Sequence, residues 1–382
     1  MPKIIKKPQA VANLESALVR AVLAGGGLSR VELARELKLV PSTAGIYVDR
    51  LIEEGYLVES TRTTAGLGRP PVVIELNPKG GRFIGVDFDA RQVLATSVDF
   101  AQQPLRELRR TIPARATTER VLTTIEECIV ELAGTRRSDV RGIGLGVPGP
   151  TDPERGVSRY YHFIRDWRDV PVGPRIAEWF KLPVFVENNL RLMAMAELWC
   201  GHGRGLRNLV CLGVRSGIGT GVIVEGRLLH GASNLAGEIG RWTCPEHLTD
   251  ADKPCTIEDV ASLTALLNEY GRGKGNESPS VADLLADGDA RPRVERAARV
   301  HAWIVHQLAS LLDPQRVVIA SPLVESETYF AALEQAALGY GGPELWSRVA
   351  RSTLGAFAGA RGAAALAFQH WKPHRTAARG TT

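Results

Sequence analysis

Apolar residues near the start of the chain recur at the spacing of α-helices. Leu14, Leu18 and Val22 lie four residues apart, which predicts an amphipathic helix. Ser29 is a preferred helix-capping residue, and it precedes a second helical segment, SRVELARELKL. Four apolar positions of that segment are expected to face the core: Val31, Leu33, Ala34 and Leu37.

A third helix is predicted after Pro41, in the run STAGIYVDRLIEEGYLVES, and Gly55 is expected to end it. Its buried stripe is Ala44, Val48, Leu51 and Ile52. Two β-rich runs, YLVES and PVVIEL, then flank the Gly/Pro-rich loop TTAGLGRPP. This order of elements predicts a winged helix-turn-helix DNA-binding domain over residues 1–78, with the third helix in the major groove.

The outer face of the predicted recognition helix carries the candidate DNA contacts. They are Ser42, Thr43, Gly45, Ile46 and Arg50, together with Arg69 on the wing. Ile46 can touch a thymine methyl group but cannot hydrogen-bond a base edge. Residues 1–80 hold eleven Lys and Arg against eight Asp and Glu, a modest basic surplus. The alternative is a three-helix module that contacts other proteins and keeps its charges solvated.

From Gly80 onward the pattern alternates between strands and helices. RFIGVDFDA, QVLATSVDF, VRGIGLGV and KLPVFVE are expected as strands, with TTERVLTTIEECIVELA as an amphipathic helix. NLVCLGVRSGIGTGVIVEGRLLHG offers two glycine-linked strands, and RVERAARVHAWIVHQLASLL is a long helix feeding the strand RVVIA. Strands that end in polar loops place ligands at their carboxyl ends. The pattern therefore predicts a two-lobed α/β body with a cleft between the lobes.

Length and composition limit the class of protein. With 382 residues and 44% hydrophobic content, the chain is long enough for two or three domains. Its five cysteines form an odd set within apolar segments, which favours a reducing compartment over a disulfide framework. No signal-peptide core and no apolar run of about 18 residues is present. A soluble, cytoplasmic protein without a membrane partner is expected.

Several motifs in this order resemble the ROK family (repressor, open reading frame, kinase), and in particular its NagC/XylR-like regulators. They are GLGVPGPTD, DWRDVP, LPVFVENN, SGIGTGVIVEGRLLHGASNLAGEIG and EDVAS. The resemblance covers nearly the whole chain and implies an actin-like (sugar-kinase/ribonuclease H-like) ATPase fold behind the DNA-binding head. It implies lobe 1 over residues 79–190 and lobe 2 over 191–371, with a C-terminal helix returning to lobe 1. The last residues, 372–382, are short, basic and Gly/Thr-rich, and are expected to be disordered.

The resemblance also implies a set of sugar-binding positions. In the family an Asn-Asp pair after the LPVFVE-like strand holds sugar hydroxyls, and here it corresponds to Asn188 and Asn189. Glu238 matches the sugar-binding Glu of the LAGEIG-like motif, and Arg241 stands where the family has a His. Glu258 matches a further sugar-binding Glu when EDVAS fixes the register. The alternative is that the two asparagines cap the next helix and the glutamates are solvated.

Three departures from the family argue against kinase activity. Asn189 occupies the position of the catalytic Asp, and an amide has no basic oxygen to take a hydroxyl proton. Asp89 and Ala90 replace glycines of a phosphate-holding turn, where Asp89 would repel phosphate. Ala320 and Ser321 replace a glycine pair near the nucleotide. Together they predict no catalytic residues and a loss of ATP binding.

No cofactor is expected. Cys244, His247 and Cys255 lie within twelve residues, but a closed zinc site needs four ligands and Arg241 repels a cation. The register that fixes Glu258 also places Thr256 on the family's zinc cysteine. A guanidinium at position 241 instead favours an effector that bears a carboxylate or phosphate. The alternative is that Arg241 pairs internally with Glu238 or Glu246.

The sequence therefore predicts a sugar-responsive transcriptional regulator, a repressor, that binds double-stranded operator DNA as a homodimer or tetramer. A sugar or sugar derivative is its effector and is not phosphorylated. One alternative is an active sugar kinase with an appended head, which needs a substitute base such as Asp152, Asp166 or Asp169. Another is a DNA-binding protein whose sugar site is vestigial.

Overall fold

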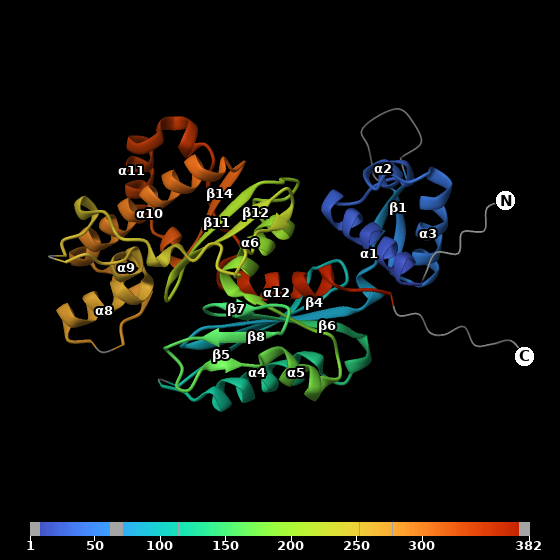
Figure 1. Cartoon of the computed structure of the whole chain (residues 1–382), viewed down its shortest axis with the longest axis horizontal. Coiled ribbons are helices and arrows are strands. Elements are labelled where there is room, and N and C mark those ends of the chain that lie inside the picture. The colour runs from blue at the N-terminus through green and yellow to red at the C-terminus, as the bar shows by residue number, and fades with distance from the viewer. Residues whose placement is uncertain (1–7, 62–71, 114, 252, 277, 374–382) are drawn as a thin grey trace, which may run out of the picture.

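The computed structural model describes residues 8–61, 72–113, 115–251, 253–276 and 278–373 (Figure 1). The N-terminal head consists of three helices and an antiparallel two-stranded sheet in the order α1 (Pro8–Gly25), α2 (Arg30–Glu36), α3 (Pro41–Glu53), β1 (Leu57–Thr61) and β2 (Val72–Leu76). The proposed wing tip with Arg69 lies outside the described residues, as do residues 374–382 of the expected disordered tail.

Local sequence signals set the boundaries of the head helices. Ser29 caps α2 in a capping box with Glu32, as its residue type predicts. Pro41 opens α3 at the first turn, where its missing N–H costs nothing. Gly55 follows α3 with a φ of +78°, a conformation that glycine adopts without steric penalty. Of the predicted stripe, Ala44, Val48 and Leu51 are buried and Ile52 is half-buried.

One position in α2 was predicted wrongly. Leu33 and Ala34 are buried, but Val31 is 60% exposed. Val31 precedes Leu33 by two residues, so at 100° per residue it lies about 200° away on the opposite face of the helix. The apolar character of α2 therefore includes one side chain that faces solvent.

Lobe 1 is built on a five-stranded mixed sheet in the order β10-β6-β3-β4-β5. Its strands are β3 (Arg82–Phe88), β4 (Gln92–Asp99), β5 (Pro104–Thr111), β6 (Val140–Val147) and β10 (Val184–Asn188). Helices α4 (Thr118–Ala133) and α5 (Val172–Phe180) cover one face, and α12 (Ala358–Gln369) covers the other (Figure 1). A small sheet of β7 (Thr151–Asp152), β8 (Val157–Tyr160) and β9 (Arg168–Val170) extends this lobe.

Lobe 2 has a second five-stranded sheet in the order β13-β12-β11-β14-β15. Its strands are β11 (Leu209–Val214), β12 (Ile218–Val224), β13 (Arg227–Leu228), β14 (Arg316–Ala320) and β15 (Val349–Arg351). Its helices are α6 (Asn189–Cys200), α7 (Ile257–Ala261), α8 (Leu263–Lys274), α9 (Val281–Ala286), α10 (Arg291–Leu312) and α11 (Glu327–Trp346).

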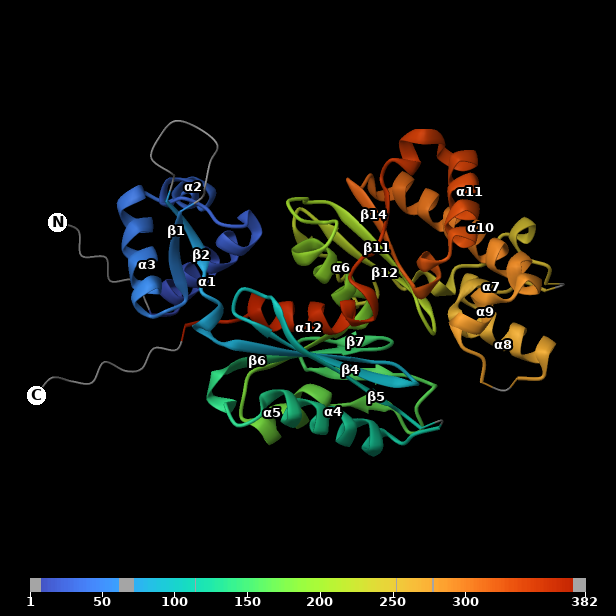
Figure 2. The same ribbon diagram turned by 180° about the vertical axis from the view of Figure 1, so that it is seen from behind.

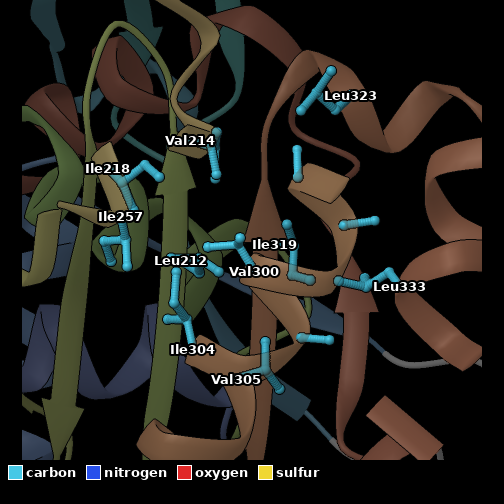
Figure 3. Packing of buried hydrophobic residues seen from close by; sticks show 14 of the residues in the cluster. Leu212, Val214, Ile218, Ile257, Val300, Ile304, Val305, Ile319, Leu323 and Leu333 are labelled. Carbon is cyan, nitrogen blue, oxygen red and sulfur yellow. The ribbon is translucent and has the colours of Figure 1, made fainter. Parts of the chain in front are cut away.

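The two faces of the lobe 2 sheet are buried against different helices. Leu212 and Ile319 belong to the large cluster with α10 and α11 that Figure 3 shows from close by. Their neighbours along the strands, Cys211 and Val318, point the other way and pack with α6. Because side chains alternate along a strand, a strand buried on both faces is continuously apolar.

Helix α12 contacts elements of both lobes. It packs against β3 and β6 of lobe 1 and against α6 (Figures 1 and 2). The helix approaches the sheet closely where strand residues lack side chains: a Cβ added at Gly144 would lie 1.8 Å from the carbonyl oxygen of Ala363. Glycine at this position therefore sets the helix–sheet distance.

The carboxyl end of α12 also holds the head. The Ser16 hydroxyl donates to the carbonyl of Trp371 at 2.8 Å, and Arg20 donates to the carbonyl of Gln369 at 3.0 Å. The Trp371 ring contacts Tyr56 with a centroid separation of 4.6 Å and Phe100 with one of 4.9 Å. Head and lobe 1 thus share one hydrophobic cluster. Within the described part of the chain, no helix is long and apolar enough to cross a membrane.

Candidate functional site

The two asparagines predicted to hold a ligand lie where β10 passes into α6. Asn188 caps α6, since its side-chain oxygen accepts from the N–H groups of Leu190 at 2.9 Å and Arg191 at 3.2 Å. Its amide nitrogen donates to the carbonyl of Gly149 at 3.1 Å. The capping alternative thus holds for Asn188, which keeps one free amide hydrogen for a ligand.

The Asn189 side chain contacts the carboxyl end of β3. Its amide nitrogen is 3.4 Å from the carbonyl oxygen of Phe88, and the residue is 6% exposed. The side chain is therefore held at the junction of the two lobes.

A buried ion pair follows in the same segment. Glu187 in β10 and Arg191 in α6 are four residues apart in the chain, with 3.0 Å between Oε1 and Nη1, and are 2% and 1% exposed. The other oxygen of Glu187 is 2.6 Å from Nε2 of His230. Arg191 also donates to the carbonyls of Asn234 and Ala236 at 2.5 and 3.2 Å. These contacts fix the loop that leads into Glu238.

Glu238, Arg241 and Glu258 surround that loop. Burial raises the pKa of Glu238 above its usual value, and Arg191 and Arg241 oppose the shift. The Glu238 carboxylate makes no hydrogen bond or ion pair with any described residue. Glu258 accepts from the backbone N–H of Ile218 at 2.9 Å. Arg241 is exposed and forms no ion pair with Glu238 or Glu246 within the described residues.

A second polar cluster links the two lobes. Arg215, in the turn between β11 and β12, donates to Asp87 at 2.6 Å and to Asp89 at 3.1 Å. Asp87 is the last residue but one of β3 and is fully buried, and burial raises the pKa of its carboxyl although Arg215 opposes the shift. Burial alone would lower the pKa of Arg215, but the two carboxylates raise it. A fixed guanidinium therefore neutralises the predicted phosphate turn.

Asp89 also shapes this turn by itself. Its Oδ1 accepts from the backbone N–H groups of Arg91 at 2.8 Å and Gln92 at 3.1 Å. Asp side chains commonly accept such bonds from the backbone two or three residues further on and so stabilise a turn. The N–H groups of Arg91 and Gln92 are therefore already paired within this turn.

The segment with the candidate zinc ligands is closed by backbone pairing. The Cys244 N–H donates to the carbonyl of Cys255 at 2.8 Å, and Thr243 and Thr256 form a β-bridge. Thr256 caps α7 in a capping box with Asp259. Burial raises the pKa of the Cys244 thiol to about 11, which disfavours the thiolate that binds metal. The described residues contain no group of three or more metal-binding side chains.

The three carboxylates considered as substitute bases are engaged or exposed. Asp152 and Asp169 both pair with Arg159, at 2.8 and 3.1 Å. The side chain of Asp166 is 78% exposed and lies near Arg165.

In the head, the exposed part of α3 carries Ser42 and Ile46, with Thr43 half-buried between them. Arg50 instead bonds Glu15 at 3.1 Å, and the Glu15 side chain is 2% exposed. Arg50 therefore links α3 to α1 across the head.

Two α/β lobes of this topology, with polar residues meeting at their junction, define the fold of the actin-like sugar kinases. The ROK family model matches residues 83–370, and the chain belongs to the ROK family. It is 28% identical to the xylose repressor of Caldicellulosiruptor bescii over 80% of this chain and 82% of that protein.

Solved structures agree with this assignment. A ROK family transcriptional regulator, a homologue of the Escherichia coli Mlc protein, superimposes with a TM-score of 0.76 at 22% identity, over 94% of this chain and 96% of the other. A ROK glucokinase from Streptomyces griseus, in complex with glucose and AMPPNP, gives a TM-score of 0.64 at 26% identity, over 76% of this chain and all of the other. The first likeness extends the shared fold through the head.

Four residues of the site were missed in the sequence: Glu187, Arg191, Arg215 and His230. The sequence contains a signal for two of them. Glu187 and Arg191 are four residues apart at the start of an apolar helix, which is the spacing of a helical ion pair. Arg215 interrupts a glycine-rich turn, but its two partners lie over 120 residues earlier in the chain.

Proposed function

We propose that this protein is a sugar-responsive, DNA-binding transcriptional regulator, acting as a repressor, whose body binds a sugar or sugar derivative without phosphorylating it. The observation that carries the proposal is a three-helix head held on a ROK body that has an amide, Asn189, at the base position. The similarity to a xylose repressor over most of both chains supports it.

The head acts as a winged helix-turn-helix. Helices α2 and α3 are joined by a short turn, and the β1–β2 hairpin extends toward the proposed wing. In such domains the N-terminal residues of the third helix enter the major groove. Ser42, Thr43 and Ile46 are proposed to contact bases, with Arg69 on the wing, whereas Arg50 positions α3 through Glu15.

Selection of duplex DNA from a random pool by the full-length protein tests this function. We expect enrichment of a pseudo-palindrome, because a twofold protein reads two half-sites one or more helical turns apart. A Ser42→Ala/Thr43→Ala variant should lose selectivity while keeping its fold. A chain that enriches no sequence would remove the DNA-binding part of the proposal.

The sugar site is formed by Asn188, Asn189, Glu238, Arg241 and Glu258. Glu238 supports this assignment, because a carboxylate that is partly withdrawn from water and lacks a partner needs hydrogen-bond donors. Sugar hydroxyls supply such donors. Thermal-shift screening across sugars, sugar acids and sugar phosphates tests it, since a ligand that binds the folded state raises the melting temperature. The shift should fall in Glu238→Gln and persist in the exposed control Glu246→Gln.

The absence of phosphorylation is argued from Asn189 and Arg215. Phosphoryl transfer needs an oriented nucleophile and a site for metal-neutralised phosphate. Asn189 cannot accept the hydroxyl proton, and Arg215 already neutralises the turn of Asp87 and Asp89. In a coupled ATP assay we expect no sugar-dependent turnover by the wild type or by Asn189→Asp, because Arg215 remains. Turnover by the wild type would revive the kinase alternative.

Arg241 points to an acidic effector. Its guanidinium is exposed and has no ion pair within the described residues, so it is available for bidentate pairing with a carboxylate or phosphate. Arg241→Ala should weaken the binding of a sugar acid or sugar phosphate far more than that of a neutral sugar. Equal losses for both would discard this part of the proposal.

Effector binding is proposed to change how two heads are placed in a homodimer or tetramer. A ligand shifts such an equilibrium only by its difference in affinity for the two arrangements. Helix α12 is the proposed connection, since it contacts α6 and the lobe 1 sheet and its carboxyl end carries the bonds to Ser16 and Arg20.

A further inference from the structure

The exposed side of α3 is uncharged in the N-terminal half of the helix. Ile46 is 61% exposed, and Ser42 on the preceding turn is exposed as well. Between them, no described heavy atom lies within 4 Å of the position that a Cβ of Gly45 would take, the adjacent residues and the surrounding backbone of α3 aside. A duplex can therefore approach the backbone of α3 closely at this point, with an aliphatic side chain and hydroxyl groups facing it.

The arginines closest to this surface are already paired within the head. Arg30 bonds both Asp49, at 2.5 Å, and Glu59. Arg50 bonds Glu15, and moving it to a base would leave a nearly fully buried carboxylate unpaired. Such a loss is costly, because a buried charge depends on its partner. Neither guanidinium is free to read guanine, the base that arginine recognises in the major groove.

Two other cations remain available. Arg35, in the last turn of α2, and Lys38, in the turn before α3, are exposed, and their side chains make no hydrogen bond or ion pair with a described residue. Cations at the edge of a recognition helix neutralise phosphates, which fixes position without reading sequence.

We propose that α3 recognises thymine by its C5-methyl group through Ile46, while Arg35 and Lys38 hold the flanking phosphates. The methyl group is the apolar feature that distinguishes thymine in the major groove, and a branched aliphatic side chain suits it. This inference rests on the proposed DNA-binding function and adds the chemical feature that is read. The partner is a duplex with thymines facing α3.

Replacement of thymine by deoxyuridine tests the proposal, because uracil keeps every hydrogen-bonding group and lacks only the methyl. The probe is the duplex that the full-length protein enriches from a random pool, made with thymine or with deoxyuridine throughout one half-site. For the wild type we expect Kd to rise about fourfold for each contacted methyl that is removed.

Two variants separate a methyl contact from a change in DNA shape. In Ile46→Ala the ratio of the two Kd values should fall to about one. In Val31→Ala, which removes an equally exposed aliphatic side chain from α2, the ratio should match the wild type. Arg35→Gln and Lys38→Gln should each make the negative slope of the log association constant against log salt shallower by about one. Neither should change the ratio of the Kd values for the deoxyuridine and thymine duplexes.

The outcomes distinguish a failure of methyl recognition from a failure of the proposed DNA-binding function. A wild-type ratio near one, or a ratio that survives in Ile46→Ala, overturns methyl recognition while the protein still selects its operator. A wild-type chain that enriches no sequence overturns the proposed function and this inference together.

Discussion

Arg215 is a single residue that ties the two lobes together. It is the described partner of Asp87, which is fully buried, so its removal leaves an uncompensated charge in the interior. We predict that Arg215→Met lowers the free energy of unfolding by about 3–5 kcal/mol. Asp89→Ala should cost less, since the Arg215–Asp87 pair remains. Denaturant titration followed by tryptophan fluorescence measures both.

The double variant Arg215→Met/Asp87→Asn separates the charge from the packing. It removes the orphaned carboxylate together with its partner, so much of the lost stability should return. If the double variant loses as much stability as Arg215→Met and Asp87→Asn lose when their separate effects are added, the cost lies in packing rather than in charge.

A buried histidine makes a pH prediction. His301 accepts from the Tyr329 hydroxyl at 2.8 Å and donates to the carbonyl of Ala261 at 3.1 Å, and burial lowers its pKa to about 4. A group with a depressed folded pKa stabilises the protein above its unfolded pKa of about 6.5, and this contribution fades as the pH falls toward 4.

From pH 7.5 to pH 5, His301 should therefore remove about 2 kcal/mol from the free energy of unfolding. His301→Gln keeps a donor and an acceptor but does not titrate. Denaturant titrations across this pH range should show a pH dependence smaller by this amount in the variant. If the free energy of unfolding depends on pH equally in the wild type and the variant, His301 does not contribute to that dependence.

At the scale of elements, close contact between α12 and the lobe 1 sheet depends on glycine. In Gly144→Ala the new methyl group would lie 1.8 Å from a backbone oxygen of α12, so the helix must move. We predict destabilisation by more than about 2 kcal/mol. Gly45→Ala is the matched control, because its methyl group meets open space within α3 and should stabilise the head by about 0.5–1 kcal/mol. Melting temperatures of both variants check the opposite signs.

The periodic elements were predictable because their signals are local. The capping box at Ser29 and the continuous apolar run of β11 lie within a few residues of what they determine. Val31 was placed wrongly because a seven-residue helix gives too few turns to fix its face. The two-residue strands β7 and β13 carry no periodic signal of their own and depend on their neighbours.

The site was predictable only in part for a related reason. The resemblance named Asn188, Asn189, Glu238, Arg241 and Glu258. Capping of α6 by Asn188 was an alternative in the sequence, but the bond from its amide nitrogen to the carbonyl of Gly149 joins positions 39 residues apart and has no local signal. Ion pairs such as Arg215–Asp87 join positions far apart in the chain, and a single sequence carries no record of such contacts.

At the scale of the whole molecule, Trp371 fastens the head to the body. Its ring packs on Tyr56 and Phe100, and its carbonyl accepts from Ser16. We predict that Trp371→Ala keeps effector binding but loses most of the effector's influence on operator affinity. Trp346→Ala, a partly buried tryptophan on α11, should lose stability without losing that influence. Thermal shift measures effector binding, and fluorescence anisotropy measures operator affinity.

The most direct test of the whole account is a titration of labelled operator with the full-length protein, repeated at saturating concentrations of each candidate sugar, without nucleotide. At least one sugar or sugar acid should change the operator Kd by about tenfold or more, and Glu238→Gln should abolish the change. An operator Kd that no sugar alters, or that changes only when ATP and Mg²⁺ are added, would contradict the account.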